Sequence, residues 1–99
     1  MIVTKSKKDG VIILTLDGKL GITTSSQLQE VIEEALKEDY EVVLDFKRLN
    51  CISSAGLWVL FMEDKSARTK GKKLKLKNVS KEIMETFYTT GFQDLLTFV

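Results

Sequence analysis

The beginning of the chain contains two segments rich in β-branched and aliphatic residues, 2–7 and 11–16. This composition predicts two strands. The pair Asp9-Gly10 between them favours the positive φ angles of a tight hairpin turn. The two strands are therefore expected to run antiparallel.

An apolar stripe at helical spacing comes next. Asp17 and Gly18 are expected to close the second strand, and residues 23–26 offer several hydroxyls that can cap a helix. Five apolar residues then recur at intervals of three and four, namely Leu28, Val31, Ile32, Ala35 and Leu36. This spacing predicts a helix with one apolar face and one charged face.

Three further segments have the patterns of strands. Residues 41–46 contain the continuous apolar run 42–44, which predicts a strand buried on both sides at the centre of a sheet. Residues 47–52 are expected to form a loop. Residues 73–77 alternate strictly between lysine and leucine, so one face of that strand should be buried and the other solvated. Residues 95–99 are expected to form the last strand.

Two more helices are expected between these strands. The serines at 53–54 can cap a helix that runs to about Thr69 and ends at Gly71. Ser80 is expected to open a third helix that stops near Gly91. The inward residues of this third helix should be Ile83, Met84 and Phe87.

The resulting order is β-β-α-β-α-β-α-β, and no proline-rich or repetitive linker interrupts it. This order predicts an α/β fold, with a mixed sheet of four to five strands and about three helices packed on it. A chain of 99 residues with 43% hydrophobic residues is expected to form one domain over residues 1–99.

The composition argues against several classes of protein. The longest apolar run, 57–62, is far shorter than the roughly 20 residues that a membrane-spanning helix needs. The amino terminus lacks the layout of a signal peptide, so a cytoplasmic location and no membrane contact are expected. Cys51 is the only cysteine, which excludes an internal disulfide, and it is expected to be a small buried residue.

The chain contains no histidine. A Ser-His-Asp triad is therefore impossible, and the commonest general base and neutral metal ligand are both missing. We expect no catalytic residues, no metal site, no cofactor and no stable small-molecule ligand.

Charge is distributed unevenly although the net charge is only +1. Residues 65–81 contain eight lysines or arginines and no acidic residue, whereas residues 30–41 are mostly acidic. A basic strip can attract nucleic acid, but neither a groove-reading motif nor base-stacking aromatics accompany this one. The lysines are expected to keep a sheet edge or open face soluble. A nucleic-acid-binding domain is the less favoured alternative.

The segment 51–62, CISSAGLWVLFM, places two hydroxyls directly before a run of large apolar residues. Together with LDF at 44–46, its part ISSAGL at 52–57 resembles the signature of the STAS domain, as found in bacterial anti-sigma factor antagonists. The order of elements and the chain length are also similar to that family, so the resemblance covers essentially the whole chain.

The resemblance implies a function. In that family a partner serine kinase, which is also the anti-sigma factor, phosphorylates the serine that corresponds to Ser54 and thereby switches binding off. The kinase supplies the catalytic base and Mg-ATP. The expected partner-binding residues are Ser53, Ser54, Ala55, Gly56, Trp58, Met62 and Gly21. Asp45 is expected to give structural support by accepting backbone hydrogen bonds, or only to end a strand.

Two departures from the family pattern remove negative charge near the expected site. Ser53 stands where the family usually has an aspartate directly before the phosphorylated serine, and Gly21 stands where it commonly has an acidic residue. A constitutive STAS subunit that is never phosphorylated, in a stress-signalling assembly or a lipid-transport machine, is therefore the alternative function. In this alternative, Ser54 is only a helix cap.

Several other residues in this segment have two possible roles. Trp58 and Met62 follow Ser54 at intervals of four, on the same helical face, where they would form a binding anchor. Trp58 would otherwise cover the edge of the core. Ala55 and Gly56 indicate close approach, either by a partner or by the sheet beneath the helix. Leu57, Leu60 and Phe61 are expected in the core.

Overall fold

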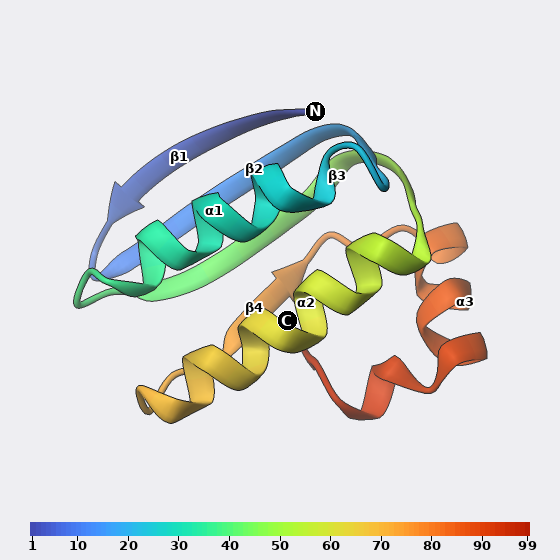
Figure 1. Cartoon of the computed structure of the whole chain (residues 1–99). Coiled ribbons are helices and arrows are strands. Elements are labelled where there is room, and N and C mark those ends of the chain that lie inside the picture. Colours follow the sequence, from blue (N-terminus) through green and yellow to red (C-terminus); the bar gives the residue numbers. More distant parts are fainter.

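The protein is described by a computed structural model that covers residues 1–99. Five strands form one sheet in the order β1-β2-β3-β4-β5 (Figure 1). The strands are β1 (Ile2–Lys8), β2 (Val11–Leu20), β3 (Glu41–Ile52), β4 (Leu74–Lys77) and β5 (Thr97–Phe98). The helices are α1 (Ser25–Leu36), α2 (Ser54–Thr69), α3 (Lys81–Thr90) and the short 3-10 helix η1 (Phe92–Asp94). The α/β prediction is confirmed.

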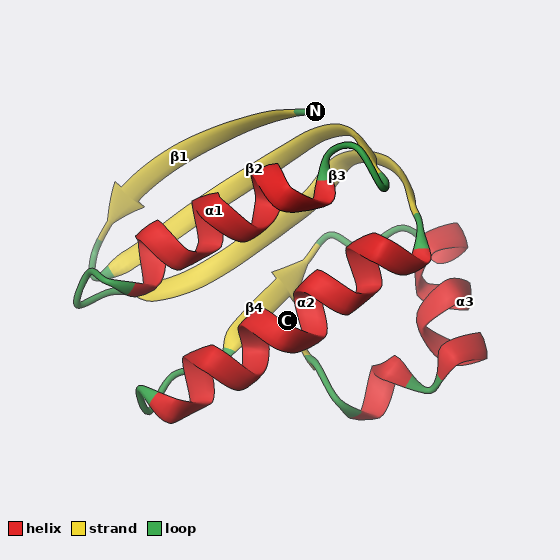
Figure 2. Cartoon of the chain, viewed as in Figure 1, coloured by secondary structure: helices red, strands yellow, loops and turns green.

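The sheet is mixed. β1 is antiparallel to β2, and the other neighbouring pairs are parallel. The hairpin turn is as predicted, because Asp9 and Gly10 both have positive φ, at 53° and 78°. Since each parallel strand is joined to the next by a helix, right-handed crossovers place the helices over one face of the sheet. Figures 1 and 2 show α1 and α2 side by side on that face.

The core lies between this face and the helices. Inward residues alternate along β2 as Ile12, Leu14 and Leu16, and all three are fully buried. α3 joins the same core, because the Phe87 ring lies with its centroid 5.2 Å from that of Phe98, in an edge-to-face arrangement. The predicted run 42–44 is buried throughout. In β4, leucines are buried and lysines partly exposed, which confirms the predicted alternation.

The prediction of a loop at 47–52 is wrong, because β3 continues to Ile52 and pairs with β2. β2 likewise continues past Asp17 and Gly18 to Leu20. Two irregularities in the pairing each give β3 one extra residue opposite β2. The inward residues of β3 therefore change from a spacing of two to a spacing of three, at Phe46, Leu49 and Ile52.

Three smaller predictions also need correction. The last strand is limited to Thr97–Phe98, because residues 92–94 form η1 and only two residues pair with β4. Cys51 is exposed, since it points away from the helix-covered face at the end of β3. Phe61 is only partly buried, whereas Leu57 and Leu60 lie in the core as expected.

Helix ends follow the expected chemistry in part. The Ser80 hydroxyl accepts a hydrogen bond from the Ile83 N–H at 3.2 Å, and Gly91 ends α3 with a φ of 79°. These contacts confirm the predicted start and stop of α3. Thr24 occupies the cap position of α1, but its hydroxyl bonds the preceding loop and not the helix.

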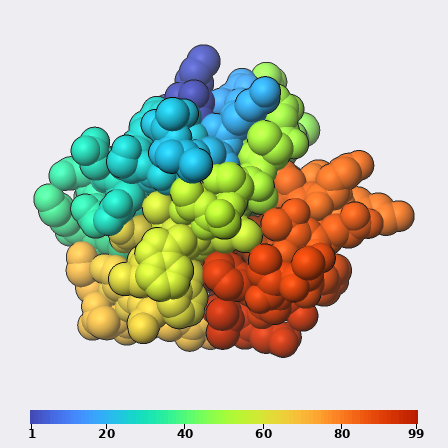
Figure 3. All heavy atoms as spheres, turned by 45° about the vertical axis from the view of Figure 1, so that its right-hand side comes forward, coloured from blue at the N-terminus to red at the C-terminus, as the bar shows by residue number.

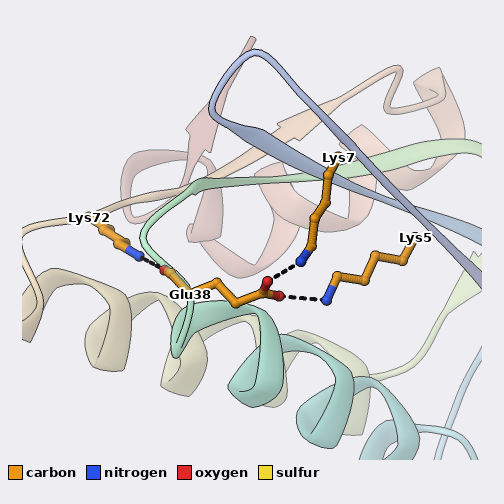
Figure 4. A network of polar contacts seen from close by, with 4 residues as sticks. All are labelled: Lys5, Lys7, Glu38 and Lys72. Carbon is orange, nitrogen blue, oxygen red and sulfur yellow. Dashed lines mark hydrogen bonds and ion pairs between the residues drawn. The ribbon is translucent and has the colours of Figure 1, made fainter.

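Glu38, in the loop between α1 and β3, joins three separate segments (Figure 4). Its carboxylate accepts hydrogen bonds from Lys5, at 2.6 Å, and from Lys7, both on β1. Its backbone carbonyl accepts one from Lys72, in the loop before β4. The Lys5 and Lys7 ammonium groups lower the pKa of Glu38. Two positive charges of β1 are thus paired with one carboxylate of the loop between α1 and β3.

Candidate functional site

The serine turn lies where β2 and β3 end together. Leu20 pairs with Ile52 at the last position of both strands, and the Ser53 N–H donates to the Leu20 carbonyl at 2.9 Å. α2 begins at the next residue, Ser54. Figure 2 shows how short this connection from β3 to α2 is. The turn is therefore fixed on both sides by regular structure.

The two adjacent serines have different environments. Ser53 occupies the cap position of α2, but its side chain makes no capping hydrogen bond, and its Oγ is buried without a partner. Ser54 is exposed at the first position of the helix. The hydroxyl that another protein can reach is thus that of Ser54.

The loop after β2 lies beside this turn. An added Cβ on Gly21 would come 4.0 Å from the Ser53 Oγ. The loop is held by Thr24, whose Oγ1 accepts from the Gly21 N–H at 2.8 Å and donates to the Lys19 carbonyl at 2.9 Å. Gly21, Ser53 and Ser54, which were all expected from the sequence to bind a partner, therefore lie next to one another.

Gly56 has a packing role. A Cβ at this position would lie 2.6 Å from the Leu20 Cγ and 3.1 Å from the Ile52 Cγ1. Because Gly56 is buried, the packing alternative accounts for this residue and explains why the first turn of α2 sits so close to the strand ends. Ala55 is partly exposed beside it.

The outer face of α2 carries two large apolar side chains that are open to solvent. Trp58 is 58% exposed and Met62 43% exposed, so Trp58 belongs to the surface and not to the core. Figure 3 shows the yellow-green surface of α2 between the cyan surface of the segment after β2 and the red surface of the C-terminal segment. Both side chains follow Ser54 along one helical face.

Sequence reasoning missed two parts of this surface. The Phe61 ring lies 5.6 Å from that of Trp58 and 5.9 Å from that of Phe92, centroid to centroid, so α2 and η1 share an aromatic row. Ile22, next to Gly21, is 81% exposed. The position of Ile22 outside the apolar stripe of α1 is the one signal in the sequence that points to its exposure.

Asp45 supports β3 and does not merely end it. Its Oδ1 accepts hydrogen bonds from the Lys47 N–H and from the Asn78 side chain, both at 3.0 Å. Burial tends to raise the pKa of Asp45, but these two hydrogen bonds and the charges of Lys77 and Lys47 lower it overall. The bond to Lys47 lies at the first irregularity of β3, which confirms the predicted backbone contact.

No group of three or more potential metal-ligating side chains comes together in the fold. None of the helices is long and apolar enough to cross a lipid bilayer.

Comparison with known sequences identifies the family of the chain. The sequence pattern of the STAS domain matches residues 3–99. The chain is 36% identical over 93 residues to BtrV of Bordetella bronchiseptica, a candidate anti-sigma factor antagonist, with 93% of this chain and 80% of that protein covered.

Solved structures share the fold. A candidate anti-sigma factor antagonist from Thermotoga maritima has a TM-score of 0.88 at 20% identity, covering 97% of this chain and 84% of that one. The anti-sigma factor antagonist SpoIIAA in its unphosphorylated form has a TM-score of 0.75 at 16% identity, covering 99% and 87%. The phosphorylated form of SpoIIAA, from Bacillus, has a TM-score of 0.73 at 16% identity, covering 99% and 91%.

Proposed function

Because the chain belongs to the STAS domain family, we propose that it is an anti-sigma factor antagonist whose unphosphorylated form captures a kinase-type anti-sigma factor. Capture of the anti-sigma factor frees a sigma factor in the cytoplasm. The name of the Bordetella relative supports the antagonist role. The chain acts as a binding module with no catalysis of its own.

One observation carries the proposal: Ser54 is exposed at the start of α2, whereas the neighbouring Ser53 hydroxyl is buried. A kinase needs to reach the hydroxyl that it phosphorylates, so Ser54 is the acceptor. Trp58 and Met62 extend the docking surface along α2, and Ser53, Ala55, Gly56 and Gly21 hold its edge in place.

Phosphorylation acts on the partner more than on the domain itself. The free N–H groups and the dipole at a helix start tolerate a phosphate at Ser54. A phosphoserine adds about −1.5 to −2 charges, so a partner surface packed against the neutral hydroxyl meets an uncompensated charge on binding. A few kcal/mol of lost affinity is enough to change the complex from mostly bound to mostly free.

A constitutive STAS subunit is the second candidate. It is favoured by Ser53 and Gly21, which leave the site without the acidic residues usual in the family. In that case Ser54 stays unmodified, but it is not the helix cap that was expected, because Ser53 occupies the cap position of α2. Phosphorylation of Ser54 therefore separates the two functions.

The test begins with a Ser54→Ala protein on a resin, which is expected to retain the kinase from an extract of the native cells. The isolated kinase is then mixed with Mg-ATP and wild-type protein, and the peptide containing Ser54 is analysed by mass spectrometry. We expect one phosphate per chain at Ser54 and none on Ser54→Ala. Absence of phosphate would favour the constitutive subunit.

Two variants complete the test. Ser53→Ala is the matched control and is expected to be phosphorylated like wild type. Ser54→Asp is expected to melt near the wild-type temperature and to bind the kinase more weakly. Equal affinity of Ser54→Asp and wild type would contradict the charge-exclusion mechanism.

A further inference from the structure

Glu63, in the middle of α2, is a buried carboxyl group that the proposed function does not use. It is 3% exposed, and its Oε2 has no hydrogen-bond partner. The adjacent Asp64 is equally buried but well paired, because it accepts from the Leu74 N–H at 3.1 Å and from the Arg68 Nε at 2.8 Å. An unpaired buried carboxylate is costly, so the state of Glu63 needs an explanation.

The neighbour that acts on Glu63 from α1 is another carboxyl, that of Glu33, which is exposed to solvent and raises the pKa of Glu63 through a hydrogen bond and its charge. Two carboxylates cannot bond each other unless one of them carries a proton. Lys70, the residue directly after α2, is the cation that acts on Glu63. The amide of Gln29 donates to Glu33 at 3.3 Å, and Lys37 on the same helix bonds Glu34 instead.

We infer that Glu63 and Glu33 share a proton that holds α1 against α2, and that loss of this proton separates the two helices and shifts the Ser54 turn. α1 follows the loop of Gly21, and α2 begins at Ser54, so both helices are directly continuous with the site. The pair is thus a proton-sensitive support for the docking surface.

The electrostatics place this change near neutral pH. Burial, followed by the hydrogen bond and the charge of Glu33, raises the pKa of Glu63 to about 7, and Lys70 opposes the rise. An unfolded glutamate titrates near 4.3. Between these values the folded chain binds more protons than the unfolded chain, so the free energy of unfolding falls as the pH rises and levels off above about 7.

NMR titration of the carboxyl carbons in the wild-type protein tests the pair directly and requires no partner. We expect the Glu63 signal to titrate near pH 7, and the amide shifts of Gly21 and Ser54 to follow the same midpoint. A Glu63 midpoint below about 5 would overturn the shared proton. Constant amide shifts at Gly21 and Ser54 during the titration would overturn the coupling to the site.

Variants give an independent readout. Glu63→Gln preserves the shape of the side chain and is expected to remove the fall in melting temperature between pH 5 and 8. Glu33→Gln is expected to lower the midpoint of Glu63, because an amide N–H can donate to the charged carboxylate. Glu34→Gln is the matched control on the exposed face of α1, and a pH profile equal to that of Glu63→Gln would contradict the assignment. None of these results depends on phosphorylation of Ser54.

Discussion

Replacing Gly56 with alanine adds a methyl group where the structure has almost no free space. The added carbon would lie 2.6 Å from the Cγ and 2.9 Å from the Cδ2 of Leu20. Leu20 is fully buried, so its side chain cannot turn out into solvent. Either Leu20 or the first turn of α2 has to move.

The magnitude follows from two opposing terms. Inserting a methyl group into a well-packed region costs about 1–3 kcal/mol. Alanine in place of glycine returns at most about 1 kcal/mol through helix propensity, and less in the first turn. We expect a net loss of about 1–2 kcal/mol, which for a domain of this size lowers the melting temperature by about 5–15 °C.

Thermal unfolding followed by circular dichroism measures this loss. Gly21→Ala is the control, because its nearest neighbour would be 4.0 Å away, and it should change stability by less than about 0.5 kcal/mol. Leu20→Ala combined with Gly56→Ala should cost less than the sum of the single changes, since the new methyl group fills part of the cavity. A Gly56→Ala protein as stable as wild type would refute the packing argument.

Three other changes have definite expectations. Asp64→Ala leaves the Leu74 N–H unpaired and should lower the free energy of unfolding, measured in urea, by about 1–3 kcal/mol. Asp64→Asn should lower it less, because an acceptor oxygen remains. Equal losses in the two variants would contradict the role of that hydrogen bond. Ser80→Ala should lower the free energy of unfolding by about 1 kcal/mol in the same assay. An unchanged stability would show that this cap does not stabilise α3. Trp58→Ala should leave the melting temperature nearly unchanged. The same change should weaken binding of the isolated kinase about tenfold in a calorimetric titration. A large drop in melting temperature with full affinity would show that Trp58 acts as a core residue.

Most of the fold could be predicted from local patterns, because these helices, strands and turns are determined by residues that are neighbours in sequence. The hairpin needed only Asp9-Gly10, and the strand at 73–77 needed only its alternation. The second half of β3 could not be predicted in this way. Its extra residues break the period of two, so a paired strand has the irregular sequence of a loop.

The position of the motif could be predicted from the sequence, but the burial of its individual side chains could not. Two adjacent serines at a helix start have the same local chemistry, and only the folded chain shows that the Ser53 hydroxyl is buried near the Gly21 loop while Ser54 is exposed. The burial of Glu63 was also hidden, because a glutamate is almost never fully buried. Both features depend on contacts between α1, α2 and the strand ends, which lie far apart in sequence.

Trp58 is the only tryptophan of the chain, and it lies on the proposed docking surface one helical turn from Ser54. Its emission therefore comes from that surface alone. Covering the indole should move the emission to shorter wavelengths, so complex formation and release can be followed in real time without attaching a dye. The protein thus carries its own optical probe at the place where regulation is proposed to act.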